Sequence, residues 1–208
     1  MGCTLSEEKI EKAIEFHGHT CPGLAIGIRV SELAINRIGI DQTASGLCVV
    51  ETDMCAVDAV QFLTGCTFGK GNLVHRDWGK AGFTFFNRDT QKGFRALFNN
   101  DFRRNDEKED PDNNTGKLMQ KVADKTATRD EVQQAEDMKA AAIARIMDAD
   151  LDDLFLVEEI KAPPVKPARI LASIQCQSCS EMVMESRMRR FDGQDLCIPC
   201  FTKKEQKV

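Results

Sequence analysis

The chain has 208 residues, of which 42% are hydrophobic and 29% charged, as in ordinary water-soluble globular proteins. Its formal net charge of −5 argues against broad electrostatic attraction to nucleic acid or to an anionic membrane. No apolar run approaches the roughly 18 residues that a membrane-spanning helix requires. The opening residues MGCTLSEEKI lack a basic segment followed by an apolar one, so we expect no secretory signal.

The chain is rich in cysteine, with nine residues of this type. An odd number cannot pair off completely, and disulfides are rare in the reducing cytoplasm, where a chain without an export signal is expected to remain. The cysteines therefore indicate metal or thiolate chemistry in a cytoplasmic protein.

The first 40 residues predict two helices with a short loop between them. Ser6 is a suitable N-cap for a helix over SEEKIEKAIEF, and the sequence HGHT then breaks the helical pattern. Pro22 suits the first position of a second helix, so Cys21 is its predicted N-cap. That helix is expected to run to Ile38 and to be closed by Gly39.

The middle of the chain predicts strands and one further helix. Residues 46–52 (GLCVVET) have the composition of a buried strand, and Asp53 is the predicted cap of a helix over MCAVDAVQFL. Residues 67–72 form a predicted loop. Two strands over 81–88 and 93–99 are expected to pair as a hairpin.

The next segments predict a surface loop, two helices and a last strand. The polar stretch 103–116 is typical of a loop, and helices are expected over 115–125 and 128–148, the second with a capping box at its start. Residues 151–160 predict the strand.

A proline-rich stretch, KAPPVKPARI, is typical of an extended connector between domains. The expected fold class is α+β: a mixed helix–sheet N-terminal domain over 1–160, a proline-rich linker over 161–172 and a small C-terminal zinc-ribbon domain over 173–208.

The C-terminal segment contains two CxxC pairs, CQSC and CIPC, separated by 17 residues. This spacing predicts a structural Zn²⁺ held by four thiolates, from Cys176, Cys179, Cys197 and Cys200. So short a segment cannot bury a stable core alone, so the metal is expected to supply much of its folding free energy. Six Lys or Arg against five Asp or Glu favour a structural or partner-docking ribbon over nucleic-acid binding by Arg187, Arg189 and Arg190.

Two of the three histidines lie close to a cysteine in HGHTC. His17, His19 and Cys21 fall within five residues, and Cys21 is expected at a helix N-terminus, where free N–H groups stabilise a thiolate. Cys55 is expected at the start of another helix, so the two cysteines could face one another. These residues, with Cys66 as a further candidate, predict a second metal site, for which Zn²⁺ is suitable.

The alternative for each of these residues is an ordinary core or surface role, or a bare thiolate at Cys21. If fewer than four protein ligands bind the ion, a position stays open for water or substrate. Asp53 and Asp58 are then candidate acid–base groups. The loop GCTFGKG fails the spacing of a phosphate-binding P-loop, yet Lys70 could present a charge to an anion.

Three strings, FHGHTCPGLAIGIR, VETDMCAVDAVQFLTGCTFGKGNL and RDWGKAGFTF, resemble the FmdE family, which takes its name from one component of molybdenum- or tungsten-dependent formylmethanofuran dehydrogenase. The resemblance covers roughly residues 5–160. The C-terminal ribbon is similar to treble-clef fingers of the DksA and TraR type. The resemblance implies an α+β homodimer whose metal site is drawn from the HGHxC and DxCxxDA segments and the loop after them, at His17, His19, Cys21, Asp53, Cys55, Asp58, Cys66 and Lys70.

Three functions follow from these patterns. The first, favoured by the resemblance, is a metal-binding accessory subunit of a molybdenum or tungsten oxidoreductase. The second is a free-standing zinc enzyme acting on an unknown small molecule, in which zinc activates water or a thiolate is the nucleophile. Its candidate catalytic groups are Asp53, Asp58, Lys70 and a histidine that does not bind the ion. The third is a ligand-sensing regulator that acts through the ribbon, which the acidic balance disfavours.

Overall fold

The computed structural model describes residues 2–42, 45–102, 114–166 and 169–205. The chain divides into two compact units, Met1–Lys166 and Pro167–Val208. The first combines helices with a mixed sheet, and the second is a small cysteine-containing module, so the predicted α+β fold class is confirmed. Most of the predicted loop over 103–116 lies outside the described residues.

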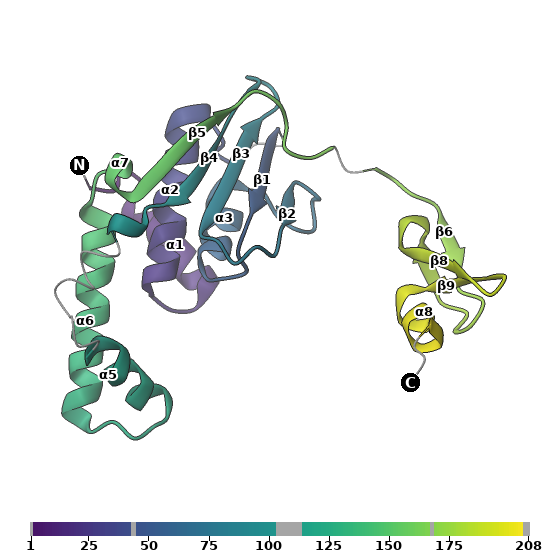
Figure 1. Ribbon diagram of the computed structural model, residues 1–208. Coiled ribbons are helices and arrows are strands. Elements are labelled where there is room, and N and C mark those ends of the chain that lie inside the picture. Colours follow the sequence, from purple (N-terminus) through teal and green to yellow (C-terminus); the bar gives the residue numbers. More distant parts are fainter. Residues whose placement is uncertain (1, 43–44, 103–113, 167–168, 206–208) are drawn as a thin grey trace. The chain divides into compact units, whose positions relative to one another are not determined.

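The first unit contains a five-stranded sheet of order β2-β1-β3-β4-β5 (Figure 1). Strands β1 and β2 pair in parallel, and the pairs β1–β3, β3–β4 and β4–β5 are antiparallel. The predicted hairpin is confirmed as β3 and β4. The strands are β1 (Gly46–Val50), β2 (Leu73–His75), β3 (Gly82–Asn87), β4 (Lys92–Phe98) and β5 (Phe155–Ile160).

Three helices lie over one face of this sheet: α1 (Glu7–His17), α2 (Pro22–Ile38) and α3 (Ala56–Thr64) (Figure 1). Because side chains alternate along a strand, every second residue of the sheet enters the core beneath the helices. In β1 these are Cys48 and Val50, and in β3 they are Phe83 and Phe85.

Local sequence sets the ends of α1 and α2 as predicted. Ser6 caps α1, and Gly18 ends it in the left-handed conformation with φ 88°. The Cys21 sulfur accepts a hydrogen bond at 3.3 Å from a backbone N–H in the first turn of α2. Gly39, also left-handed, closes that helix. The chain between Gly18 and Cys21 is therefore held at both ends by helix caps.

The start of α3 differs from the prediction. Its N-cap residue is Cys55 and not Asp53, and the Cys55 side chain makes no capping hydrogen bond. Thr52 organises the turn instead, because its hydroxyl accepts a hydrogen bond from the Met54 backbone N–H at 3.2 Å. The Asp53 side chain is exposed and free of the helix.

Two short elements were not predicted from the sequence. Strand β2 follows the predicted loop and pairs with β1, with Leu73 opposite Cys48. Helix α7 (Leu151–Leu154) occupies the first part of the expected strand over 151–160, so β5 begins only at Phe155. Asp152 and Asp153 lie in the first turn of α7, where negative charge favours a helix.

A helical pair, α5 (Asn114–Ala123) and α6 (Arg129–Asp148), follows the sheet strands, and the predicted capping box is present at the start of α6. Leu118 of α5 and Ala135 of α6 are both buried where the two helices pack. The C-terminal part of α6 packs against α2 and contributes Ile146 to the main core.

The contact between α2 and the end of α6 includes a fully buried arginine. The Arg29 guanidinium donates hydrogen bonds to the carbonyls of Met147 at 2.9 Å and Ala149 at 2.6 Å, and lies 3.1 Å from the Glu32 carboxylate. The other oxygen of Glu32 accepts two hydrogen bonds from Thr4, each of 2.7 Å. Because a buried charge is costly unless it is paired, these bonds fix the end of α6 on α2.

The second unit consists of two small hairpins and a helix. Its buried residues are Cys176, Leu196 and Cys197, so this small core is built largely from cysteine. The elements are β6 (Ser173–Gln175), β7 (Met182–Met184), the short 3₁₀ helix η1 (Glu185–Arg187), β8 (Met188–Phe191), β9 (Gln194–Cys197) and α8 (Ile198–Glu205).

Candidate metal centre and cleft

Four potential metal ligands converge where three helices begin or end. His17 is the last residue of α1, His19 lies in the turn after it, Cys21 caps α2 and Cys55 caps α3. One ligand atom from each of these side chains lies within 4.8 Å of the others. The prediction that Cys21 and Cys55 face one another is therefore confirmed.

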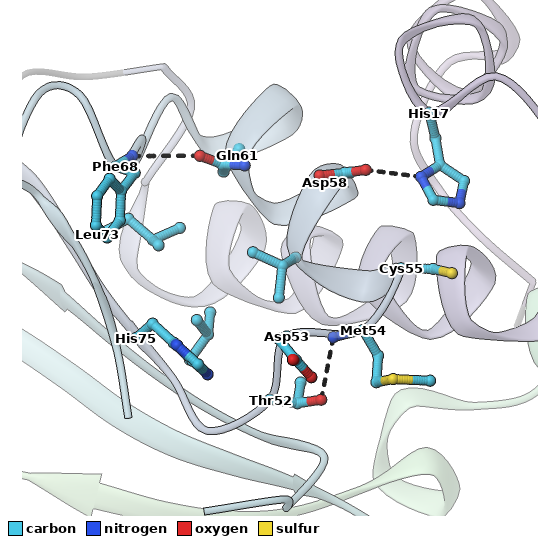
Figure 2. Close-up of a pocket in the computed structure, with 12 residues that line it drawn as sticks. His17, Thr52, Asp53, Met54, Cys55, Asp58, Gln61, Phe68, Leu73 and His75 are labelled. Carbon is cyan, nitrogen blue, oxygen red and sulfur yellow. Dashed lines mark hydrogen bonds and ion pairs between the residues drawn. The ribbon is translucent and has the colours of Figure 1, made fainter. Parts of the chain in front are cut away.

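A carboxylate fixes the orientation of His17. The Nδ1 atom of His17 lies 2.7 Å from Oδ2 of Asp58, in the first turn of α3 (Figure 2). A proton on Nδ1 that is donated to this carboxylate leaves the lone pair of Nε2 free, and Nε2 lies 3.9 Å from the Cys21 sulfur. Histidine ligands of metals are commonly held by a carboxylate in this way.

Two imidazoles and two thiols form a suitable donor set for zinc. Tetrahedral zinc with bonds of about 2.0–2.3 Å places its ligand atoms about 3.3–3.8 Å apart. The ligand atoms of the four side chains lie within 4.8 Å of one another, and imidazole nitrogen and thiolate sulfur are donors that zinc prefers. The residues present therefore fit a Zn²⁺ ion.

The surroundings of the Cys55 thiol raise its pKa. Burial raises its pKa, and the hydrogen bond and charge of Cys21 raise it further. A cation between the two sulfurs reverses this effect, because it stabilises both thiolates.

Two glycines of α2 let the ligand-bearing helices approach closely. A Cβ atom at Gly23 would lie 3.3 Å from Cβ of Cys55 and 3.8 Å from the Cys21 sulfur. A Cβ atom at Gly27 would lie 2.3 Å from the backbone oxygen of Ala56, which no side chain tolerates. The absence of these side chains brings the N-termini of α2 and α3 together.

A cleft of about 400 Å³ adjoins the four ligands, and its size suits a small molecule. His17 and Cys55 belong both to the cluster and to the wall of this cleft. Figure 2 shows the further lining side chains, which come from the end of β1, from α3, from the loop after it and from β2. The lining residues are His17, Val50, Thr52, Asp53, Met54, Cys55, Val57, Asp58, Gln61, Phe68, Leu73 and His75.

The other predicted site residues lie in different places. Asp53 and Asp58 both line the cleft, with Asp58 engaged by His17. Cys66 is fully buried in the main apolar core, outside the group of four. The ammonium of Lys70 donates to the Gly65 carbonyl at 3.0 Å, and Lys70 is not among the lining residues.

The sequence did not single out Gln61, Phe68 or His75 as parts of one site. His75 reaches the cleft because β2 pairs with β1, which places it beside Val50. Gln61 lies on the same face of α3 as Asp58, three residues later, and its side chain accepts a hydrogen bond from the Phe68 backbone N–H at 3.2 Å. A three-residue spacing on a helix is the one sequence signal that could have linked Gln61 to the site.

The C-terminal unit brings its four cysteines together as well: ligand atoms of Cys176, Cys179, Cys197 and Cys200 lie within 4.8 Å of one another. The sulfurs of Cys179 and Cys197 are 3.9 Å apart, close to the roughly 3.8 Å edge of a tetrahedral zinc–thiolate site. Backbone N–H groups of Cys179 and Cys197 lower the pKa of Cys176 to about 6. This sulfur therefore favours the thiolate that zinc binds.

An α+β domain with a histidine–cysteine cluster, followed by a four-cysteine finger, defines a class of metal-binding protein with two separate groups of potential ligands. Residues 16–156 match the family model described as "FmdE, Molybdenum formylmethanofuran dehydrogenase operon". The chain belongs to the FmdE family, as the sequence resemblance implied. Residues 169–206 match the prokaryotic dksA/traR C4-type zinc finger, so the second unit is a zinc finger of that type.

Two known proteins are similar over most of the chain. A protein of Archaeoglobus fulgidus named "Probable S-adenosyl-L-methionine-binding protein" is 30% identical over 197 residues, which make up 91% of this chain and 51% of that protein. The chain thus spans about half the length of this relative. The crystal structure of a protein from Syntrophus aciditrophicus described as "tungsten formylmethanofuran dehydrogenase subunit e (fmde)-like" matches with a TM-score of 0.58 and 22% identity, covering 96% of this chain and 94% of that one. This second match supports the fold.

Among the residues that the structure describes, no helix combines the length and apolar character needed to cross a bilayer.

Proposed function

We propose that this zinc-binding FmdE-family protein is an accessory subunit of a molybdenum- or tungsten-dependent oxidoreductase, with a second zinc ion in its N-terminal domain. The observation that carries the second ion is the convergence of His17, His19, Cys21 and Cys55 within 4.8 Å. The hydrogen bond from His17 to Asp58 supports it, because that bond leaves Nε2 available to the ion.

In this proposal the residues of the chain have separate tasks. Bound zinc supplies Lewis acidity and a fixed positive charge. Cys21 and Cys55 bind it as thiolates and neutralise its charge. Asp58 orients His17, and the exposed His19 is the ligand with the least surrounding structure to hold it. Departure of His19 would leave a coordination position of the ion for another ligand.

The accessory role is supported by the family description, which refers to a molybdenum formylmethanofuran dehydrogenase operon. The cysteines also favour it: outside the two ligand clusters this sequence has Cys3, Cys48 and Cys66, too few for a four-cysteine iron–sulfur cluster. We propose that electron transfer takes place in partner subunits, and that the chain acts there as a homodimer.

The metal proposal is tested by elemental analysis of the full-length protein produced with added zinc. We expect two zinc ions per wild-type chain and one in the double variant Cys21→Ser/Cys55→Ser. Cys3→Ser is the matched control and should keep both ions. Cys66→Ala should also keep both, because Cys66 lies in the core and outside the group of four ligands. A double variant that retains two ions would overturn the proposal.

The partner proposal is tested in the native cells. Affinity-tagged wild-type protein should co-purify with a complex that contains molybdenum or tungsten, measured by the same elemental analysis. Light scattering of the isolated protein should give twice the chain mass of 23.2 kDa. A tagged protein that brings down neither metal is not an accessory subunit of such an enzyme.

A second candidate function follows from the cleft, since His17 and Cys55 belong both to its wall and to the proposed metal site. A free-standing protein could bind a small molecule there. Because the archaeal relative is named as an S-adenosyl-L-methionine-binding protein, we propose this nucleoside as the ligand. Calorimetric titration of the zinc-loaded, full-length protein with S-adenosyl-L-methionine tests this candidate function. If the isolated protein does not bind the nucleoside, the accessory role is the remaining proposal.

A further inference from the structure

The cleft has a negative character that follows from its lining. The lining residues include two carboxylates, Asp53 and Asp58, and neither lysine nor arginine. Lys70, the nearest lysine in the sequence, donates to the Gly65 carbonyl and lies outside the lining. An anionic ligand would therefore meet repulsion here, and a cationic one would be attracted.

The proposed zinc ion leaves this balance unchanged. Its two positive charges are matched by the thiolates of Cys21 and Cys55, so the site contributes no net charge to the cleft. Asp58 is already bonded to His17. Asp53 has no hydrogen-bond or ion-pair partner within the part of the chain that the structure describes, and it lies between Thr52 and Met54 at the cleft wall (Figure 2).

Two large apolar side chains on the wall of the same cleft are exposed. Met54 is 65% exposed and Phe68 is 72% exposed, and both line the cleft. A polarizable thioether and an aromatic face are surfaces on which an apolar or aromatic group can pack, and the ring face also attracts cations. Together with a free carboxylate, they suit an organic cation that carries an apolar or aromatic part.

We infer that the cleft selects organic cations and that Asp53 is the residue that determines this specificity. The inference rests on the proposed small-molecule function of the cleft and assigns the charge of its ligand. S-adenosyl-L-methionine has a positively charged sulfonium, whereas S-adenosyl-L-homocysteine has the same nucleoside and amino-acid groups around a neutral sulfur. The cleft is expected to prefer the first.

The test is calorimetric titration of zinc-loaded, full-length protein with each nucleoside. Since a partly exposed ion pair contributes up to about 1 kcal/mol, we expect wild type to bind the sulfonium about fivefold more tightly than the thioether. Asp53→Asn should remove this preference by weakening sulfonium binding alone. Asp89→Asn, at an exposed aspartate in the turn between β3 and β4, is the matched control and should keep it.

Raising the ionic strength gives a second measurement that needs no variant: it should weaken sulfonium binding in wild type and leave thioether binding unchanged. Equal affinities for the two nucleosides, or a preference that survives Asp53→Asn, would overturn the inference. So would the absence of binding by both nucleosides to protein that holds two zinc ions, a result that leaves the metal proposal intact. Zinc content, measured on each sample, decides the metal proposal separately.

Discussion

The N-terminal cluster and the C-terminal finger each bring four donor side chains together, but the surrounding protein supports them differently. In the finger, Cys176 and Cys197 are themselves the buried core, with Leu196 beside them. In the N-terminal domain the donors lie at helix ends, outside a main core that Phe83, Phe85 and other strand residues build. We conclude that a metal ion organises the fold of the finger, whereas the proposed second ion would be added to an existing fold in the N-terminal domain.

The largest expected effect is the unfolding of the C-terminal finger when it loses its zinc ion. In Cys179→Ser, one thiolate of the four is lost, and structural zinc in fingers contributes about 10–16 kcal/mol of binding free energy that is also folding free energy. The variant should lose one zinc ion per chain, and residues 169–205 should unfold while the N-terminal domain stays folded. Two-dimensional NMR would show this as collapse of the finger signals alone. Retained dispersion of those signals would contradict the view that zinc organises this unit.

An intermediate effect is expected at Asp58, which contacts the proposed ligand His17. Asp58→Asn keeps an oxygen that can accept the His17 hydrogen bond but removes its charge, so zinc affinity at the N-terminal site should fall about 10- to 100-fold. Competition with a chelator measures this. The finger should keep its zinc, and Glu136→Gln, at an exposed position on α6, should change neither site.

The smallest effect concerns stability without metal. Glu51 is buried and accepts two hydrogen bonds of 2.7 Å from the Arg95 guanidinium, and this pairing lowers the pKa of Glu51. A carboxyl whose pKa is lower in the folded state stabilises the fold above its ordinary pKa near 4.5, and the contribution is lost as the pH falls through the folded value.

Metal-free Glu51→Gln should therefore be less stable than metal-free wild type at neutral pH, by about 1 kcal/mol, and the difference should shrink in acid. Urea unfolding of the N-terminal domain at several pH values measures it. If the difference in unfolding free energy between the two proteins stays constant with pH, the ion pair does not contribute through its charge. That result would also weaken the view that this domain is stable without zinc.

Local signals allowed much of the fold to be predicted from the sequence. Ser6, Pro22 and Gly39 set helix ends through their own backbone and side-chain chemistry, so α1 and α2 were found within a residue or two. Strand β2 could not be found this way, because three residues carry little pattern and become a strand only through pairing with β1. Asp53 was wrongly assigned as a cap, since Thr52 organises that turn.

Local sequence signals also allowed part of the candidate site to be predicted. HGHTC places three donors together in sequence, and Cys55 was added because strand ends and helix starts often meet. The bond between His17 and Asp58 joins residues 41 positions apart, and no local rule connects them. The cleft depends equally on tertiary structure, because Phe68 and His75 reach it from a loop and a short strand after α3.

The buried Arg29 has a mechanical consequence. It ties the last residues of α6 to the middle of α2, and Cys21 is the N-cap of α2. The end of α6 and the proposed metal ligand Cys21 are thus both attached to α2. A protein that binds to the α5–α6 pair would contact a segment that Arg29 joins to the helix capped by Cys21.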